Sequence, residues 1–472
     1  MRKDKDLLGE VLLPDNVYHG AQTERARVLC NPSFEKLNAY PELIHALTQI
    51  KKAAAKAHRE IGTLDETKAD AIDKACDEIL AGKFDDHFVV DVFQGGGGVG
   101  VHMNVNEVIA VRANEIITGE LGSEAVHPNT HVNMGQSTND VLPAAMKMAV
   151  YDRLADVVEA ASVLHRALLA KAAEFDSAVK ISRTCIQDAV PITLGQTFSG
   201  YAALIARRIA ELEEARKTML SLPLGGTVVG TGLGTFSGYL PKVYRYLAEF
   251  SGVDYVPEEN FFDGLQNADQ YITISSCLKS LACGASKIGR DFRMMSSGPR
   301  AGLNELELAA VQNGSSIMPG KVNPALPELM NMVCYQICGH DTSITMAAEA
   351  GELDLNVWEG IFITNIMASC RLLVECVPVF AEKCVQSVRV NQDVCTRNAE
   401  NSLALAMVVS AMFGYVKGAE VAEYAVSRDI TIKEAVLALG LLSEDQATEV
   451  LDPLMLTNIE KSGNLLLSLH KE

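Results

Sequence analysis

Apolar residues recur every three or four positions along the middle of the chain, which is the spacing of one face of an α-helix. The longest such stretch runs from Asp140 to Asp176. Its apolar positions are Met146, Val150, Leu154, Val157, Ala161, Leu164 and Leu168. Similar stretches run from Asp263 to Met295, from Pro327 to Ala347 and from Ile361 to Ser387, the last with an expected kink at Pro378. The pattern predicts several long helices.

Helices of this length must pack along one another. The longest would span about 45–55 Å, more than the diameter of a small domain, so we expect a helix bundle. Small residues in the second stretch allow close approach and indicate burial on more than one side. They are Ala282, Gly284, Ala285 and Ser286. We therefore expect the bundle to associate with further copies of the chain.

The two ends of the chain carry shorter helical patterns. Before the bundle, helices are expected at Pro41–Gly62, Thr67–Gly82 and Asn104–Gly119, the last after a glycine cluster at Gly95–Gly98. The pattern predicts an all-α protein with three parts. These are a mixed, mainly helical N-terminal domain (1–138), a central helix-bundle domain (139–390) and a small C-terminal helical domain (391–472).

Composition narrows the class of protein. The chain has 472 residues, 48% of them hydrophobic but only 6% aromatic, which suits close helix packing better than a β-sandwich. A net charge of −19 makes nucleic acid an improbable partner. The 11 cysteines form no CxxC pair and are expected to be free thiols in a reducing compartment. We see no signal peptide and no membrane-spanning stretch, and expect a cytoplasmic protein without a membrane partner.

Three polar segments interrupt the helical pattern, and the first, His131–Asp140, lies directly before the longest helix. Its residues Ser137, Thr138 and Asn139 could simply cap the helix start. Hydroxyl and backbone N–H groups at a helix N-terminus can equally hold a carboxylate. Four polar residues in a row exceed what a cap requires, but the sequence leaves both interpretations open.

The other two segments are also ambiguous. Ser182–Pro191 has polar groups among apolar neighbours, so it is either a solvated loop or a partly buried segment whose polar atoms need partners. Gly314–Pro324 combines glycines, prolines and serines, and Lys321 follows Ser315 by six positions. It lacks the order of a phosphate-binding GxxxxGK[ST] loop. Composition alone favours a flexible surface loop.

Taken together, the segments resemble the aspartase/fumarase superfamily over nearly the whole chain. The matching stretches are Leu7–Glu10, Asp91–Glu107, Asn133–Asp140, Arg183–Gln196, Gly225–Thr235, Ser296–Glu305 and the family signature Gly314–Pro324. The resemblance implies three domains with a central five-helix bundle, and a homotetramer with a twenty-helix core. It also implies active sites that are each built by three chains, with no metal and no cofactor.

The resemblance assigns roles in proton removal. Ser315 would be the catalytic base that takes a proton from the carbon beside a carboxylate. A serine can do this only if its oxyanion is stabilised by backbone N–H groups and cations in a dry site. Lys321, Asn323 and Thr184 would stabilise the aci-carboxylate dianion that forms.

The resemblance also assigns roles in substrate binding. Ser137, Thr138 and Asn139 would hold the second carboxylate, and Ser316 would close over it. Arg25 matches an arginine near the site. The leaving group would then depart from the neighbouring carbon in an anti elimination.

Within the superfamily, several stretches are similar to the aspartase versions. They are Ser297–Glu305, Gln187–Pro191 and Leu355–Val357 followed by Glu359. The resemblance therefore implies the reversible elimination of ammonia from L-aspartate to give fumarate.

Four positions bear on the leaving group. Val99 stands where relatives commonly carry a hydroxyl, and Cys185 stands where many carry histidine. His102, where aspartases usually have asparagine, either fills space beside the helix start or replaces a lost donor. Trp358, the single tryptophan, either packs in the bundle or offers an aromatic face to a bulky or quaternary ammonium group. The pocket for the leaving group is expected to be less polar than in relatives.

These positions keep other functions open. One is a lyase with a different amine leaving group, such as a bulkier amine or the trimethylammonium group that ergothionase expels. Another is fumarate hydratase. A third is a non-catalytic member such as the lens crystallins of this fold. Such a member is expected to lose loop residues, whereas Ser315, Lys321 and Asn323 are all present.

Overall fold

The computed structural model describes residues 1–29, 31–33, 35–122 and 124–469. Within that part the chain is mainly helical, with short strands in two-stranded pairs. The helices are α1 (Ala21–Leu29), α2 (Pro41–Glu60), α3 (Glu66–Leu80), α4 (Val99–Thr118), α5 (Thr138–Glu174), α6 (Leu194–Lys217), α7 (Tyr239–Ser251), α8 (Phe261–Gln266), α9 (Asp269–Met295), α10 (Ala325–Glu349), α11 (Glu359–Phe380), α12 (Gln392–Glu400), α13 (Ala406–Phe413), α14 (Tyr415–Arg428), α15 (Ile432–Ala438), α16 (Glu444–Val450), α17 (Pro453–Leu456) and α18 (Ile459–Leu469). The strands are β1 (Arg2–Asp6), β2 (Gly9–Leu13), β3 (Val179–Thr184), β4 (Gln187–Thr193), β5 (Ser221–Leu222), β6 (Val256–Pro257), β7 (Leu306–Glu307) and β8 (Arg389–Val390).

The chain forms two compact units, and each takes part of the long helices α5, α6, α9, α10 and α11. The first unit comprises Met1–Val158, Ala210–Ser280 and Gln336–Leu372. The second comprises Glu159–Ile209, Leu281–Tyr335 and Leu373–Glu472. These units are defined by spatial compactness, and the sequence division at 138/139 and 390/391 stays a prediction.

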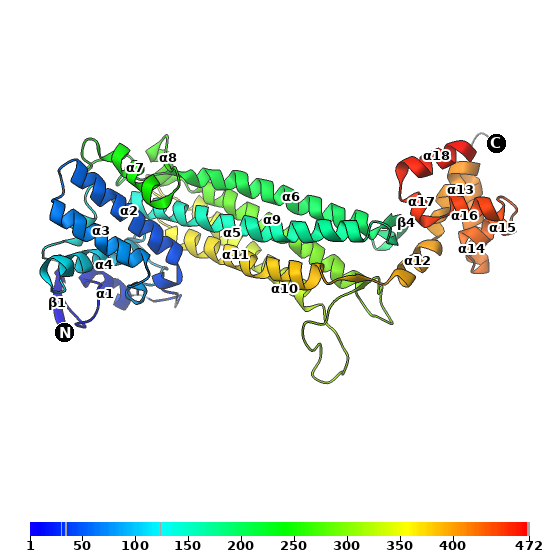
Figure 1. Cartoon of the computed structure of the whole chain (residues 1–472), viewed down its shortest axis with the longest axis horizontal. Coiled ribbons are helices and arrows are strands. Elements are labelled where there is room, and N and C mark those ends of the chain that lie inside the picture. The colour runs from blue at the N-terminus through cyan, green and yellow to red at the C-terminus, as the bar shows by residue number, and fades with distance from the viewer. Residues whose placement is uncertain (30, 34, 123, 470–472) are drawn as a thin grey trace. The chain divides into compact units, whose positions relative to one another are not determined.

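In the first unit, α2, α3 and α4 lie side by side (Figure 1). The start of α1 is held by Glu107, a buried carboxylate on α4. This carboxylate accepts hydrogen bonds from the backbone N–H groups of Gly20, Gln22 and Thr23 at 2.8–3.0 Å. Because the first N–H groups of a helix have no partner within the helix, Glu107 satisfies them and fixes α1 against α4.

The long helices are joined by buried contacts within each unit. In the first unit, the rings of Tyr271 on α9 and Phe362 on α11 stack with their centres 5.0 Å apart. In the second, Phe292 on α9 packs against Phe198 on α6 and Phe380 on α11. These aromatic contacts occupy the apolar faces that the sequence pattern predicts.

The C-terminal helices α13 to α18 surround a hydrophobic cluster of their own within the second unit. Sequence signals for two of them are plain. Thr431 with Glu434, and Ser443 with Gln446, form capping boxes at the starts of α15 and α16.

The all-α class is confirmed, and most predicted helices are present near their expected bounds. One prediction was wrong in detail, because the stretch from Asp263 to Met295 is two helices. The backbone of Asn267 is extended between α8 and α9 and ends the shorter one. The bundle helix α6 was missed, because Gly195, Gly200 and a charged second half obscure its pattern.

Residues Glu359–Val385 form a stretch long and apolar enough to cross a membrane by length and composition alone. The sequence analysis predicted no stretch of this length and hydropathy. Because Phe362 and Phe380 in it pack on aromatic rings of α9, we interpret this segment as a core helix of the bundle.

Candidate active site

The starts of α4 and α5 meet in the first unit. Nδ1 of His102, in the first turn of α4, lies 2.7 Å from Oγ1 of Thr138, the first residue of α5. Each helix start carries unpaired N–H groups and the positive end of the helix dipole. Their convergence makes this part of the unit favourable for an anion.

Gly98 allows this close approach. It caps α4 with a left-handed backbone (φ 68°). A Cβ atom at this position would stand 2.2 Å from Cδ2 of Leu142, a buried side chain on α5. Glycine therefore meets two requirements here, a positive φ and the absence of a side chain. The glycine cluster in the sequence signals the turn, whereas the contact with Leu142 comes from the fold.

The segment Ser137–Asp140 has more internal structure than a cap. The buried carboxylate of Asp140 accepts from the backbone N–H groups of Ser137, Gly225 and Thr227 at 2.9–3.0 Å. Burial raises the pKa of Asp140, and these hydrogen bonds oppose the rise. The side chain of Asn139 donates to the carbonyl of Val228 at 2.8 Å. Asp140 and Asn139 thereby fasten the glycine-rich segment that follows Gly225 to the start of α5.

Lys51 on α2 also belongs to this junction, although the sequence analysis did not select it. Its ammonium group is fully buried and lies 2.7 Å from Nε2 of His102. It also donates to Oδ1 of Asn133 at 2.8 Å and to Oε1 of Gln136 at 2.9 Å. Burial lowers the pKa of Lys51 to about 7, opposed by attraction to Asp140. A signal existed, because Lys51 follows Leu47 by four positions on the apolar face of α2.

His102 is also fully buried. Burial, with repulsion from the Lys51 charge, holds its pKa well below the ordinary value of histidine, so the imidazole is neutral. In this arrangement one ring nitrogen faces Lys51 and the other faces Thr138. Both nitrogens are therefore occupied within the chain.

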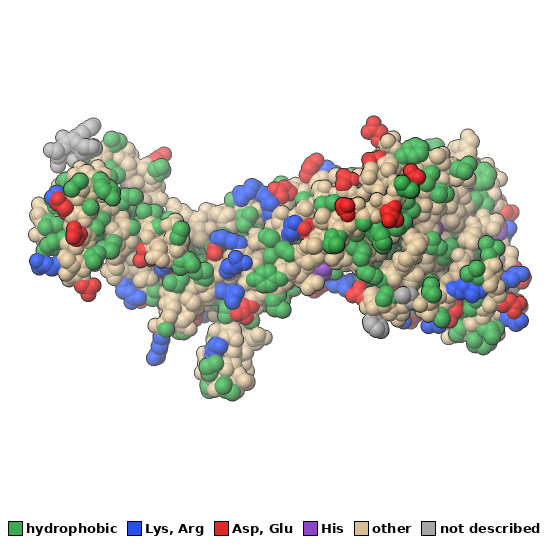
Figure 2. Space-filling model, turned by 180° about the vertical axis from the view of Figure 1, so that it is seen from behind, with side chains coloured by type: hydrophobic (Ala, Val, Ile, Leu, Met, Phe, Trp, Pro, Cys, Tyr) green, Lys and Arg blue, Asp and Glu red, His purple; other side chains and the backbone are tan. Residues whose placement is uncertain are grey.

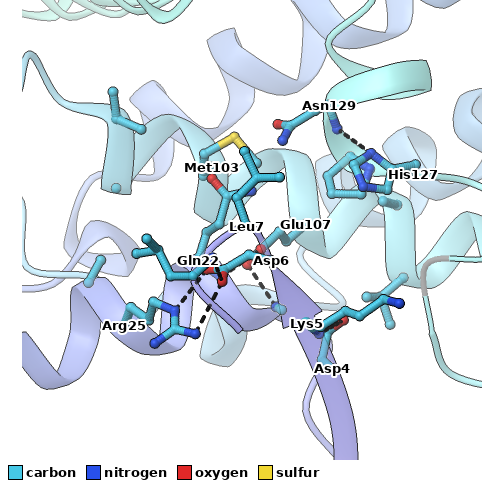
Figure 3. Close-up of a pocket in the computed structure, with 18 of the residues that line it drawn as sticks. Asp4, Lys5, Asp6, Leu7, Gln22, Arg25, Met103, Glu107, His127 and Asn129 are labelled. Atoms are coloured by element: carbon cyan, nitrogen blue, oxygen red, sulfur yellow. Dashed lines mark hydrogen bonds and ion pairs between the residues drawn. The ribbon is translucent and has the colours of Figure 1, made fainter. Parts of the chain in front are cut away.

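A cavity of about 620 Å³ in the first unit brings together Arg25 and Val99 (Figure 3). Arg25 donates through Nε and Nη2 to the two carboxylate oxygens of Asp6 at 2.8 and 3.1 Å. This pairing lowers the pKa of Asp6. Val99 presents an apolar side chain to the cavity, whose other lining residues include His127 and Asn129.

In the second unit, Thr184 and Cys185 lie at the turn between strands β3 and β4. The strands are antiparallel, with Thr184 paired to Gln187. Cys185 and Ile186 both have positive φ angles, 52° and 62°. Such angles suit a two-residue hairpin turn but are uncommon for these residue types, and such outliers gather at functional sites. Both Thr184 and Cys185 are exposed.

The signature loop is also in the second unit, where it extends away from α10 and projects at the surface (Figures 1 and 2). Oγ of Ser315 accepts from the backbone N–H groups of Ile317 and Met318 at 3.2 and 3.0 Å. Asn323 closes the base of the loop by donating to the carbonyl of Gly314 at 2.7 Å. The side chain of Ser316 is exposed.

Beside this loop lies a second cavity, of about 840 Å³. Lys321 and Asn323 line it, and so do Arg290 and Arg293 from α9. The structure thus brings Lys321 and Asn323 together with two further cations that the sequence reading did not select.

The predicted site residues fall into two groups. Arg25, Val99, His102, Ser137, Thr138 and Asn139 belong to the first unit, and Thr184, Cys185, Ser315, Ser316, Lys321 and Asn323 to the second. Trp358, in the first unit, donates its ring N–H to the carbonyl of Ala350 at 2.9 Å and is partly exposed.

Comparison with known proteins identifies the family of the chain. Residues 9–339 match a lyase family and residues 408–458 match the fumarase C C-terminus. The chain is 41% identical to an aspartate ammonia-lyase from a Bacillus species, covering 97% of this chain and 98% of that protein. It is 42% identical to a class II fumarate hydratase from Bradyrhizobium diazoefficiens, covering 97% and 96%.

A solved structure is similar as well. The crystal structure of a fumarate lyase:delta crystallin from Brucella melitensis is 42% identical and superposes with a TM-score of 0.94, covering 97% of this chain and 99% of that one. Fold and sequence together define a helical lyase. The chain belongs to the aspartase/fumarase superfamily.

Proposed function

We propose that this protein is an ammonia-lyase that reversibly removes ammonia from L-aspartate by anti elimination, giving fumarate. The observation that carries the proposal is the junction of α4 and α5. There the polar side chains of Ser137, Thr138 and Asn139 lie beside the N-termini of two helices. A dianionic substrate needs such a site on a protein whose net charge is −19. The identity to an aspartate ammonia-lyase supports the choice of substrate.

Ser315 would be the base. Its Oγ already accepts two backbone N–H groups, from Ile317 and Met318, and hydrogen bonds of this kind stabilise an alkoxide. The alkoxide would take the proton from the carbon next to the carboxylate. Lys321 and Asn323, which line the neighbouring cavity, would stabilise the negative charge that moves into that carboxylate.

The exposed Thr184 at its hairpin turn would contribute a further donor to the same carboxylate. Ser316, on the same loop as Ser315, would close over the other carboxylate, which Thr138 and its neighbours hold. Arg25 would lie near that carboxylate, with its orientation set by Asp6. Loop closure would then expel water at the moment of proton transfer.

We further propose a cytoplasmic homotetramer with shared active sites. The two groups of site residues lie in different units. Met332, Tyr335 and Met346 are all more than half exposed and follow one face of α10. Apolar stripes of this kind are usually covered by another chain. Light scattering coupled to size exclusion tests the assembly, and a monomer at micromolar concentration would contradict it.

The substrate assignment is tested by the ultraviolet absorbance of fumarate formed from saturating L-aspartate. We expect turnover from L-aspartate and little from L-malate under the same conditions. Absence of fumarate from L-aspartate by an intact, folded protein would reject this function.

Two other candidate substrates are favoured by specific observations. The identity to a class II fumarate hydratase favours malate, and fumarate formation from L-malate alone would establish it. The apolar Val99 in its cavity favours a bulkier amine leaving group, as in an N-substituted aspartate or a trimethylammonium acid. A higher kcat/KM for such substrates than for L-aspartate would decide for that lyase.

A further inference from the structure

A chain of hydrogen bonds through the buried side chains of Lys51 and His102 connects α2 with the starts of α4 and α5. An ammonium group has three N–H donors, and Lys51 meets three acceptors, on His102, Asn133 and Gln136. The full use of its donors explains how a cation tolerates complete burial. This arrangement needs no contribution from a substrate.

The neighbours of His102 fix its tautomer. Its Nε2 faces two donors, Nζ of Lys51 at 2.7 Å and Nδ2 of Asn106 at 3.4 Å. A ring nitrogen that faces donors must present its lone pair. The single proton of the neutral imidazole therefore sits on Nδ1, where it is donated to Oγ1 of Thr138 at 2.7 Å.

The direction of this hydrogen bond determines what Thr138 can do. Because its oxygen accepts from His102, its own O–H is left to donate elsewhere. Thr138 is half-buried at the first position of α5, beside the free N–H groups of that helix start. Its hydroxyl is thus directed to act as a donor, which a carboxylate requires.

We propose that Lys51 and His102 form a buried relay that holds Thr138 as a hydrogen-bond donor to a substrate carboxylate. Lys51 and His102 are positioning residues, because they act on the substrate through Thr138. The relay brings the polarising effect of a cation to a hydroxyl without exposing the cation to solvent. The identity of the bound carboxylate rests on the proposed function. The geometry of the relay itself does not.

Neutron diffraction from crystals of the unmodified protein tests the geometry directly. The relay requires deuterium on Nδ1 of His102, none on Nε2, and a Thr138 O–D bond that points away from the ring. Deuterium on Nε2 would overturn the proposal. This measurement is independent of turnover, so it stands even if L-aspartate is not the substrate.

Binding of succinate, measured by calorimetry on the assembled protein, tests the effect on an anion. Succinate is a dicarboxylate without a leaving group, so its Kd reports binding alone. Lys51→Met and His102→Asn should each weaken binding about tenfold. In His102→Asn the amide can replace Nδ1 toward Thr138 but has no second nitrogen for Lys51.

The double variant decides whether the two residues act together. If the two residues form a relay, adding Lys51→Met to His102→Asn should change the Kd of succinate little further. If the two substitutions act independently, their effects on Kd should multiply. Lys147→Met is the matched control, because Lys147 is similarly buried on α5 and pairs with Glu258, about 13 Å along the helix from Thr138. It should leave the Kd of succinate unchanged. If the two substitutions raise the Kd of succinate by factors that multiply, Lys51 does not act through His102. If Lys147→Met weakens succinate binding as much as Lys51→Met, the effect of Lys51 is not specific to the site. Either result would contradict the relay.

If Lys51→Met does not assemble, His102→Gln keeps the test open. Glutamine can accept from Lys51 but has no nitrogen at the position of Nδ1. Weaker succinate binding by a stable His102→Gln protein supports the relay, and an unchanged Kd contradicts it.

Discussion

Nδ1 of His102 and Oγ1 of Thr138 are 2.7 Å apart, which ties the first turn of α4 to the first residue of α5. Two helix dipoles therefore end side by side, each contributing roughly half a positive charge. The hydroxyl and amide groups of the Ser137–Asn139 segment lie at this junction.

Replacement of Ser315 by alanine should abolish turnover. It removes the proposed base while leaving the Asn323 contact at the base of the loop in place. We expect kcat to fall by about three orders of magnitude, which is typical of a lost general base. Ser316→Ala is the control on the same loop, and should raise KM more than it lowers kcat. Equal kcat values for Ser315→Ala and wild type would reject the base.

Shared active sites should permit complementation between two inactive variants. Ser315→Ala is altered in the second unit, and Thr138→Val in the first. If these residues reach one site from different chains, tetramers reassembled from an equal mixture should regain about a quarter of wild-type activity. Each variant reassembled alone is the control. No recovery in verified mixed tetramers would indicate sites built within one chain.

A methyl group at Gly98 should destabilise the protein more than one at Gly97. Both residues have positive φ angles, so alanine costs about 1 kcal/mol of strain at either position. At Gly98 the methyl would also meet Leu142, which should add about 1–3 kcal/mol. Urea unfolding measures both changes.

A double-mutant cycle identifies the cause of the Gly98 effect. Leu142→Ala removes the atom that a Cβ at Gly98 would meet. The cost of Gly98→Ala should then shrink toward that of Gly97→Ala. An undiminished cost in the Leu142→Ala background would mean that backbone strain alone is responsible.

The buried Glu359 should make stability depend on pH. Neither of its carboxylate oxygens has a hydrogen-bond partner among the residues that the structure describes, and burial raises its pKa to about 7 from 4.5. Below pH 4.5 the group is protonated in both folded and unfolded states. Between pH 4.5 and 7 the folded state holds the proton more tightly, so stability falls as pH rises, by about 3 kcal/mol in total.

Glu359→Gln should remove this loss. The variant should exceed wild type in free energy of unfolding at pH 8 and match it near pH 5, at fixed protein concentration. Glu352→Gln is the control, because Glu352 is exposed on the segment between α10 and α11, shortly before Glu359. Parallel pH profiles for wild type and Glu359→Gln would show that folding does not raise the pKa of Glu359.

Cys185 should influence which leaving group is accepted. Histidine tolerates the positive φ of this position, and it is the residue that the resemblance to the superfamily implies there. Cys185→His should increase the preference for L-aspartate over N-methyl-L-aspartate by about tenfold in kcat/KM. Ile186→His, at the neighbouring position of the same turn, should leave the ratio unchanged. If Cys185→His leaves the ratio of the two kcat/KM values unchanged, Cys185 does not influence the choice of leaving group.

The sequence by itself determined the all-α class, most of the long helices and the superfamily. Helix periodicity and capping are local properties, so stretches such as Asp140–Asp176 are readable without the fold. The signature Gly314–Pro324 is a contiguous segment, so it can be recognised from the sequence alone. The local pattern did not predict the break at Asn267, which divides an apparently continuous helix into α8 and α9. It also did not predict α6, because glycines obscure the helical pattern there.

Only the tertiary structure decided which polar residues meet. Lys51, His102 and Thr138 are separated by 51 and 36 positions, and their hydrogen bonds depend on how α2, α4 and α5 pack. The same holds for Arg25, whose guanidinium is paired with Asp6, and for Gly98, whose neighbour is Leu142. Residue type and spacing along the chain identify candidates for chemistry. Burial and partners arise from contacts between distant segments, and these set the charge and hydrogen-bond direction of each candidate.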